Sequence, residues 1–248
     1  MDRSVFESTK KLFFDSINKG DLSKSKQQNR KFCEDVYYFA VYQGYLDAKR
    51  TFKGVSKIGD KKEDAFKELA GKIENYFEET FQDDQDYFDQ KHNEMCKSLI
   101  DSFKKSGYII TYGQAQKIVN MAFKYLYCCE DAEKRKDYFK YCHMALDTYT
   151  LNWYNRKTGK NIKEWSKLCE KVYKEIQSNI RENKEYNGTV LENEFIIWPD
   201  EMLLEAMENL NEAAKREIVS HKNSIISNEI DKLEQNIEKI KSWFAYNN

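Results

Sequence analysis

Residues 111–126 read TYGQAQKIVNMAFKYL, and the rest of the predicted fold is built outward from this stretch. Its apolar residues recur at spacings of three and four, which is the period of one continuous helix face. That face carries Ala115, Ile118, Val119, Ala122, Phe123 and Leu126. The opposite side, where an amphipathic helix places its solvated residues, carries Gln116, Lys117, Asn120 and Lys124. The stretch therefore predicts a helix that opens at a small-residue turn around Gly113.

Helical spacing continues on both sides of this stretch, and the chain has only one proline and nine glycines in 248 residues. Sandwiches and barrels need many more turn residues than that. We therefore expect an all-α, multi-helix globular fold with a long C-terminal helix. The predicted organisation is an N-terminal helical region over residues 1–90 and a second over 91–248, with a single domain over 1–248 as the alternative.

Polar, glycine-containing stretches and the single proline predict where the helices begin and end. Residues 51–62 and 153–163 are polar and contain glycine, so both are predicted loops. Pro199 is predicted to precede the long last helix, with Asp200 as its N-cap. In that helix apolar residues alternate at spacings of four and three, which is typical of a coiled-coil seam. The seam consists of Ile226, Ile230, Leu233, Ile237, Ile240 and Phe244. We expect this seam to pack on the protein's own body or, alternatively, on a second copy or a partner helix.

Charge and composition exclude some classes of protein. The 41 basic and 42 acidic residues nearly cancel, which counts against a strongly basic nucleic-acid-binding domain and leaves room for a local basic face. No segment is apolar over the length needed to cross a membrane, and the first residues lack a signal peptide's apolar core. The prediction is a cytoplasmic protein without a membrane partner. The six cysteines form no CxxC pair, so neither a metal nor another cofactor is expected.

Two charged residues, 30 positions apart, point to chemistry. Backbone N–H groups at a helix start can hold an anion such as phosphate, and Lys117 lies in the first turns of the predicted helix. Residues 143–147 read HMALD and place Asp147 at the predicted start of another helix. Lys117 could act as a nucleophile and Asp147 as a charge stabiliser. The alternatives are a solvated lysine, a helix-capping aspartate and, for His143, a partly buried polar residue.

The pattern Gly113-x-Ala115-x-Lys117, followed by Leu146-Asp147, resembles the hairpin segment of the helix-hairpin-helix DNA glycosylase superfamily. The spacing is most similar to that of the archaeal 8-oxoguanine glycosylase branch. Ala115 stands where the superfamily has a second hairpin glycine, and no proline precedes Asp147. The resemblance implies a central helix-hairpin-helix-like element, duplex DNA as partner, and Lys117 and Asp147 as catalytic residues. It also implies DNA contacts by Gly113, Gln114, Gln116, Asn120, Lys124 and His143.

The implied reaction is excision of a damaged base, with Schiff-base lyase chemistry at Lys117 as an extension. Lys117 would be deprotonated by burial and would attack the sugar, while an ionised Asp147 stabilises the developing positive charge. Tyr149 and Trp153 are predicted to stack on the base. The two groups must then lie within about 10 Å of each other. Lys117→Ala should remove the Schiff base and leave stability almost unchanged.

Two other functions compete with this one. A non-enzymatic helical interaction or adaptor protein fits the near-neutral charge and the C-terminal seam. A nucleic-acid-binding protein without catalysis would keep the hairpin and lose the chemistry. Binding to phosphates would weaken steeply as salt rises, which separates the two binding functions.

Overall fold

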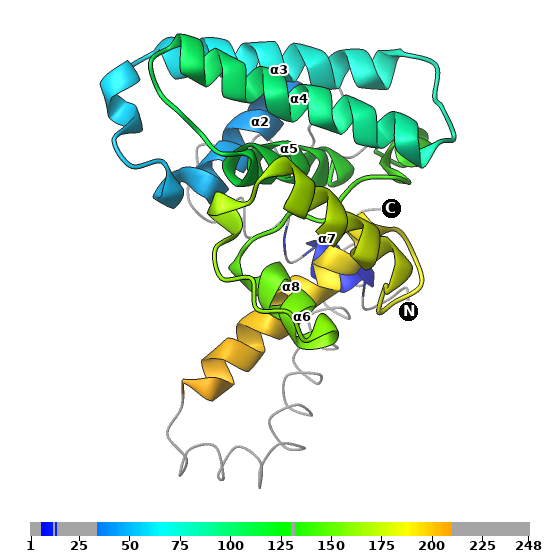
Figure 1. Cartoon of the computed structure of the whole chain (residues 1–248). Helices are drawn as coiled ribbons and strands as arrows, with labels where there is room; N and C mark the ends of the chain where they lie inside the picture. Colours follow the sequence, from blue (N-terminus) through cyan, green and yellow to red (C-terminus); the bar gives the residue numbers. More distant parts are fainter. Residues whose placement is uncertain (1–5, 12, 14–33, 130–131, 210–248) are drawn as a thin grey trace, which may run out of the picture. The chain divides into compact units, whose positions relative to one another are not determined.

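The computed structural model describes residues 6–11, 13, 34–129 and 132–209, and in these ranges it contains helices and no strand (Figure 1). The predicted all-α, multi-helix fold is confirmed. The chain divides into two compact units, Met1–Glu201 and Met202–Asn248. Residue 90 lies inside a helix, and a division of folding units at that point stays a prediction. No described helix is long and apolar enough to cross a bilayer.

Seven α-helices between residues 34 and 208 account for most of the described chain. Short 3₁₀ turns connect some of them, among them η4 (Ala132–Phe139) and η5 (Trp165–Lys167). The helices are α2 (Glu34–Ala48), α3 (Lys61–Glu78), α4 (Gln85–Lys105), α5 (Tyr112–Tyr127), α6 (Thr148–Thr158), α7 (Glu170–Glu182) and α8 (Val190–Glu208).

Helix α5 lies at the centre of the first unit. Figure 1 shows α5 with the layer of α3 and α4 on one side and α7 on the other. Helix α2 approaches α5 closely, since a Cβ added at Gly44 would lie 2.6 Å from the carbonyl oxygen of Ile118. All residues of α5 from Tyr112 to Leu126 are buried. The prediction that this helix has a solvated face is therefore wrong, because its polar side is covered by other parts of the chain.

Local signals decide where α5 begins. Thr111 caps the helix through a capping box, in which its Oγ1 accepts from Gln114 N–H at 3.1 Å and Gln114 Oε1 accepts from Thr111 N–H at 3.0 Å. Such reciprocal bonds satisfy two of the backbone donors that a helix start leaves open. The helix thus begins one residue before the predicted turn at Gly113.

Two predicted breaks differ from the structure. The predicted loop over 153–163 is wrong in its first half, since α6 continues to Thr158 and ends at Gly159, whose φ is 68°. Pro199 lies inside α8 and does not precede it. A proline inside a helix removes one backbone hydrogen bond, and here burial of Phe195, Ile196 and Ile197 on the preceding turn holds the helix together. The predicted seam over 226–244 lies outside the described residues.

Candidate functional site

The structure brings Lys117 and Asp147 together. Lys117 Nζ lies 2.7 Å from Asp147 Oδ2, and the two side chains are 5% and 13% exposed. Asp147 also caps α6, because its Oδ1 accepts from the backbone N–H groups of Tyr149 at 3.0 Å and Thr150 at 3.1 Å. The predicted N-cap is confirmed, and the two charged groups lie within the separation of about 10 Å that the catalytic role requires.

The protonation of this pair differs from the prediction for a nucleophilic lysine. Burial alone lowers the pKa of Lys117, but the carboxylates of Asp147, Glu194 and Asp47 outweigh it and raise the pKa above its ordinary value. Burial would raise the pKa of Asp147, and Lys117 lowers it below its ordinary value. The pair is therefore an ammonium and a carboxylate at neutral pH. The prediction that burial leaves Lys117 deprotonated is wrong for this arrangement.

A second buried ion pair lies two turns further along α5. Lys124 Nζ is 2.9 Å from Glu194 Oε1, with side-chain exposures of 4% and 0%. The ammonium also lies 4.6 Å and 4.7 Å from the ring centroids of Phe13 and Phe195. Lys124 is thus held by a carboxylate of α8 and by two aromatic faces, which stabilise a cation.

The segment of residues 143–146 leads to Asp147 and has no regular secondary structure, yet it is buried. Its backbone groups are bonded by side chains of α5, α6, α7 and α8. Gln177 and Gln116 bond Met144 and Leu146, respectively, while Glu194 Oε2 accepts from Ala145 N–H at 2.7 Å. Buried backbone groups need such partners, which explains why these polar side chains lie in the core.

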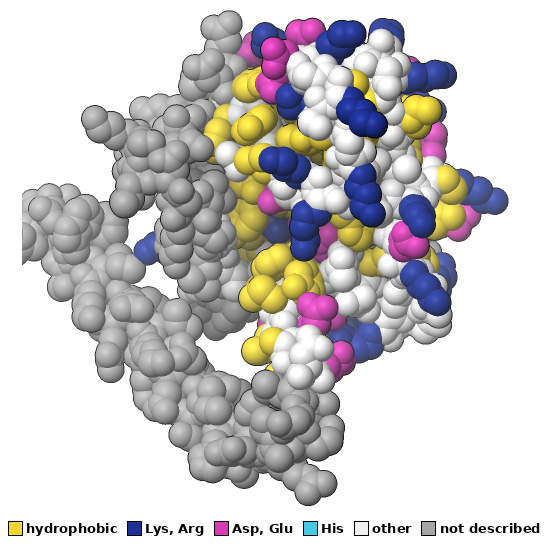
Figure 2. Space-filling view, turned by 90° about the vertical axis from the view of Figure 1, so that its left-hand side faces the viewer, with side chains coloured by type: hydrophobic (Ala, Val, Ile, Leu, Met, Phe, Trp, Pro, Cys, Tyr) yellow, Lys and Arg dark blue, Asp and Glu magenta, His cyan; other side chains and the backbone are white. Residues whose placement is uncertain are grey.

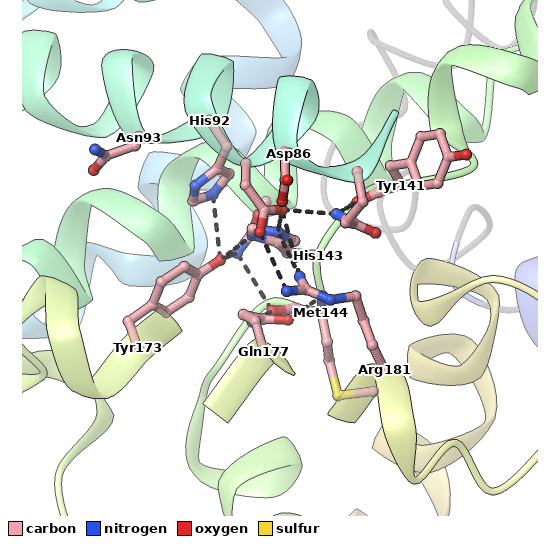
Figure 3. A network of polar contacts seen from close by, with 12 residues as sticks. Asp86, His92, Asn93, Tyr141, His143, Met144, Tyr173, Gln177 and Arg181 are labelled. Atoms are coloured by element: carbon pink, nitrogen blue, oxygen red, sulfur yellow. Dashed lines mark hydrogen bonds and ion pairs between the residues drawn. The ribbon is translucent and has the colours of Figure 1, made fainter. Parts of the chain in front are cut away.

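A buried network of polar side chains lies beside this segment (Figure 3). His143 Nε2 is 2.7 Å from Asp89 Oδ1, and its Nδ1 is 2.9 Å from the hydroxyl of Tyr173. That hydroxyl also lies 2.8 Å from Asn120 Nδ2 and 3.3 Å from His92 Nε2. At the half-buried end of the network, Arg181 Nη2 lies 3.2 Å from Asp89 Oδ2. His143 is therefore a buried polar residue.

N–H groups of the predicted anion site at the start of α5 are bonded within the protein, and anion binding there stays a prediction. Gly113 N–H donates to Leu168 O at 3.0 Å, and Ala115 N–H donates to Thr111 O at 3.1 Å. A Cβ at Gly113 would lie 2.1 Å from the carbonyl oxygen of Trp165, so η5 packs directly on this turn. The glycine accommodates the backbone of η5, and these N–H groups already have acceptors.

The predicted DNA-binding residues are all buried in this structure. Gln114 and Gln116 are 7% and 0% exposed, and Asn120, Lys124 and His143 are 1%, 3% and 4% exposed. Gly113 is buried as well. Each side chain among them has a partner inside the protein. Direct contact of these residues with DNA stays a prediction, and it requires that the surrounding side chains move.

The aromatic residues near Asp147 are only partly those predicted. Trp153 is 2% exposed, and its Nε1 donates to Glu185 Oε2 at 2.6 Å, so its ring is part of the core. Tyr149 is half-buried and packs edge-on against Trp198, with ring centroids 5.0 Å apart. Trp198 Nε1 donates to Asp147 Oδ2 at 3.0 Å. Phe123 lies in the core as predicted.

Sequence reasoning missed Glu194, Gln177 and Trp198. All three contact the segment that ends at Asp147, and they come from α7 and α8, more than 25 residues further along the chain. Glu194 lies directly before a run of apolar residues over 195–198. A charged residue beside such a run was a signal for a buried ion pair, but nothing local identified its partner.

Comparison with protein-family models, with curated proteins and with solved structures found no match. Among the described residues, no three His, Cys, Asp or Glu side chains are grouped so as to hold a metal ion. On the face in Figure 2, Lys and Arg side chains are scattered among apolar and acidic ones.

We expect the protein to lose stability as the pH falls below about 6.5, the ordinary histidine pKa. Burial lowers the pKa of His143 and, more strongly, that of His92. The unfolded chain then binds protons that the folded chain does not, so each histidine costs up to about 1.4 kcal/mol per pH unit below its unfolded pKa. Urea unfolding at pH 7 and pH 5 measures this. The same series on His92→Gln should show a shallower loss, and equal slopes would contradict the assignment.

Proposed function

We propose that the chain is a DNA-glycosylase-like protein that excises a damaged base, with Asp147 and Lys117 as the reacting pair. The observation that carries the proposal is the 2.7 Å contact between Lys117 Nζ and Asp147 Oδ2. An amine and a carboxylate this close can act on the same sugar carbon. The half-buried rings of Tyr149 and Trp198 support the proposal, because they lie beside Asp147 and an aromatic face can stack on a base.

The charges of the pair define the order of events. A target base rotated out of the stack would displace Lys117 from Asp147, leaving the carboxylate to stabilise the cationic sugar. The bond between C1′ and the base breaks, and its electron pair leaves with the base. The Lys117 ammonium gives its proton to that base, and the resulting amine forms the bond to C1′. The C1′–O4′ bond then breaks, its electron pair goes to O4′, and O4′ takes up the proton that the amine releases, so the opened sugar is held as the Schiff base.

The test is borohydride trapping on duplex oligonucleotides that carry an abasic site or 8-oxoguanine. We expect a covalent adduct with the wild-type protein and none with Lys117→Arg. Arginine keeps a positive charge beside Asp147, so this variant should fold while lacking the nucleophile. Lys117→Ala is a poorer control, since it leaves a buried carboxylate unpaired. We therefore expect this variant to lose stability, in place of the nearly unchanged stability that the sequence predicts.

A helical interaction protein without catalysis is the second candidate, and one observation favours it. The predicted DNA-binding side chains and the N–H groups at the start of α5 have partners within the protein. If the wild-type protein yields neither adduct nor strand cleavage at low salt, this second function replaces the first. DNA binding that persists at low salt and weakens steeply with added salt would then indicate a nucleic-acid binder.

A further inference from the structure

The peptide bond between Leu146 and Asp147 is fixed from both sides. Its carbonyl oxygen accepts from Gln116 Nε2 at 2.8 Å, and its N–H donates to Thr150 Oγ1 at 2.9 Å. Gln116 Oε1 also accepts from Leu146 N–H at 3.2 Å. One amide side chain therefore holds both backbone groups of the residue that precedes Asp147.

A second amide side chain makes the same pair of bonds further from Asp147. Gln177 Nε2 donates to Met144 O at 2.7 Å, and Gln177 Oε1 accepts from Met144 N–H at 3.3 Å (Figure 3). Gln177 and Gln116 are equally buried, at 1% and 0% exposure. Each glutamine thus holds the backbone of one residue with the same pair of bonds, and the two differ in which residue they hold.

Gln116 is itself held in place. Its Oε1 accepts from Asn120 Nδ2 at 2.9 Å, and Asn120 is bonded in turn to the Tyr173 hydroxyl. Gln116 also lies directly before Lys117 on α5, so a single turn of helix carries the ammonium and the group that orients its carboxylate partner. Residues 143–146 have no regular secondary structure, so they have no helix or sheet hydrogen bonds that could supply this orientation.

We propose that Gln116 is a positioning residue for Asp147, which sets the carboxylate against Lys117 by holding the Leu146 peptide. This inference rests on the proposed function for its catalytic meaning, but the positioning itself can be measured without any reaction. Trp198 Nε1 donates to Asp147 Oδ2 at 3.0 Å, so its indole N–H reports where that oxygen lies.

The experiment compares Gln116→Met with Gln177→Met in protein labelled with ¹⁵N at its four tryptophans, using Trp198→Phe to assign the indole resonance. Both variants remove two hydrogen bonds to the backbone of one buried residue, and Gln116→Met also removes the bond from Asn120 Nδ2, so it should be the more destabilised of the two. We expect the Trp198 indole signal to move in Gln116→Met and to stay in Gln177→Met. We also expect trapping on the abasic duplex to fall about 100-fold in Gln116→Met alone, which is the scale of a 1 Å misplacement.

The two readouts separate the proposals. If the wild-type protein traps no DNA and the indole signal still moves only in the Gln116 variant, the proposed function fails and the positioning role stands. An unmoved signal in folded Gln116→Met, or equal movement in both variants, overturns the positioning role. Should Gln116→Met not fold, Gln116→Asn carries the same test, since its amide is one methylene too short to hold both groups of Leu146.

Discussion

Replacing Lys124 by Met is expected to lower the free energy of unfolding by about 3–5 kcal/mol. The reason is the partner that the substitution leaves behind, since Glu194 is 0% exposed and its Oε1 faces Lys124 Nζ at 2.9 Å. A buried carboxylate without a counter-charge must either stay ionised in a poor solvent or take up a proton. Methionine nearly matches the length of lysine, so little of the loss comes from a cavity. Urea unfolding measures it.

Two variants give this prediction its controls. Lys174 pairs with Glu170 at the surface, at 2.6 Å and with exposures of 48% and 33%, so Lys174→Met should cost less than about 1 kcal/mol. Adding Glu194→Gln to Lys124→Met removes the orphaned charge and keeps an oxygen for Ala145 N–H. The double variant should therefore regain much of the lost stability. Additive losses would show that packing and not charge is responsible.

The helices and their local caps could be predicted because their signals lie within a few residues. The spacing of Ala115, Ile118 and Phe123 predicts α5, and Asp147 with Thr150 three residues later caps α6 through a capping box. Helix periodicity assigns a face to each residue without showing what covers that face. The prediction that a helix begins after Pro199 is wrong for the same reason, because burial of the preceding turn decides that α8 continues through the proline.

The site could be predicted only in part. The resemblance required Lys117 and Asp147 to lie near each other, but the sequence could not show that they do. The raised pKa of Lys117 depends first on Asp147 and then on Glu194 and Asp47, from α8 and the end of α2. Likewise, Gln116 and Asn120 have the spacing of a solvated face, and only the path of residues 143–146 beside α5 explains their burial. Long-range partners of buried polar groups leave no periodic trace in one sequence.

Gly113→Ala is expected to be the other strongly destabilising substitution, with a loss of about 3 kcal/mol, the upper end of the usual range for overpacking. The added Cβ would lie 2.1 Å from Trp165 O and 3.0 Å from Leu168 N, both backbone atoms that cannot turn away as a side chain can. Moving η5 outward would also break the bond from Gly113 N–H to Leu168 O. Thermal and urea unfolding measure the loss.

Gly71→Ala is the matched control, because Gly71 lies inside α3 and a Cβ there has no heavy atom within 4 Å. It should stabilise the protein by up to about 1 kcal/mol, since alanine is the better helix former. The comparison also decides why Gly113 is small. A phosphate-binding turn would tolerate alanine in the absence of DNA and lose only affinity, whereas a backbone contact loses stability with no ligand present. Unchanged stability of Gly113→Ala would therefore contradict the packing role of Gly113 and favour an anion-binding role for this turn.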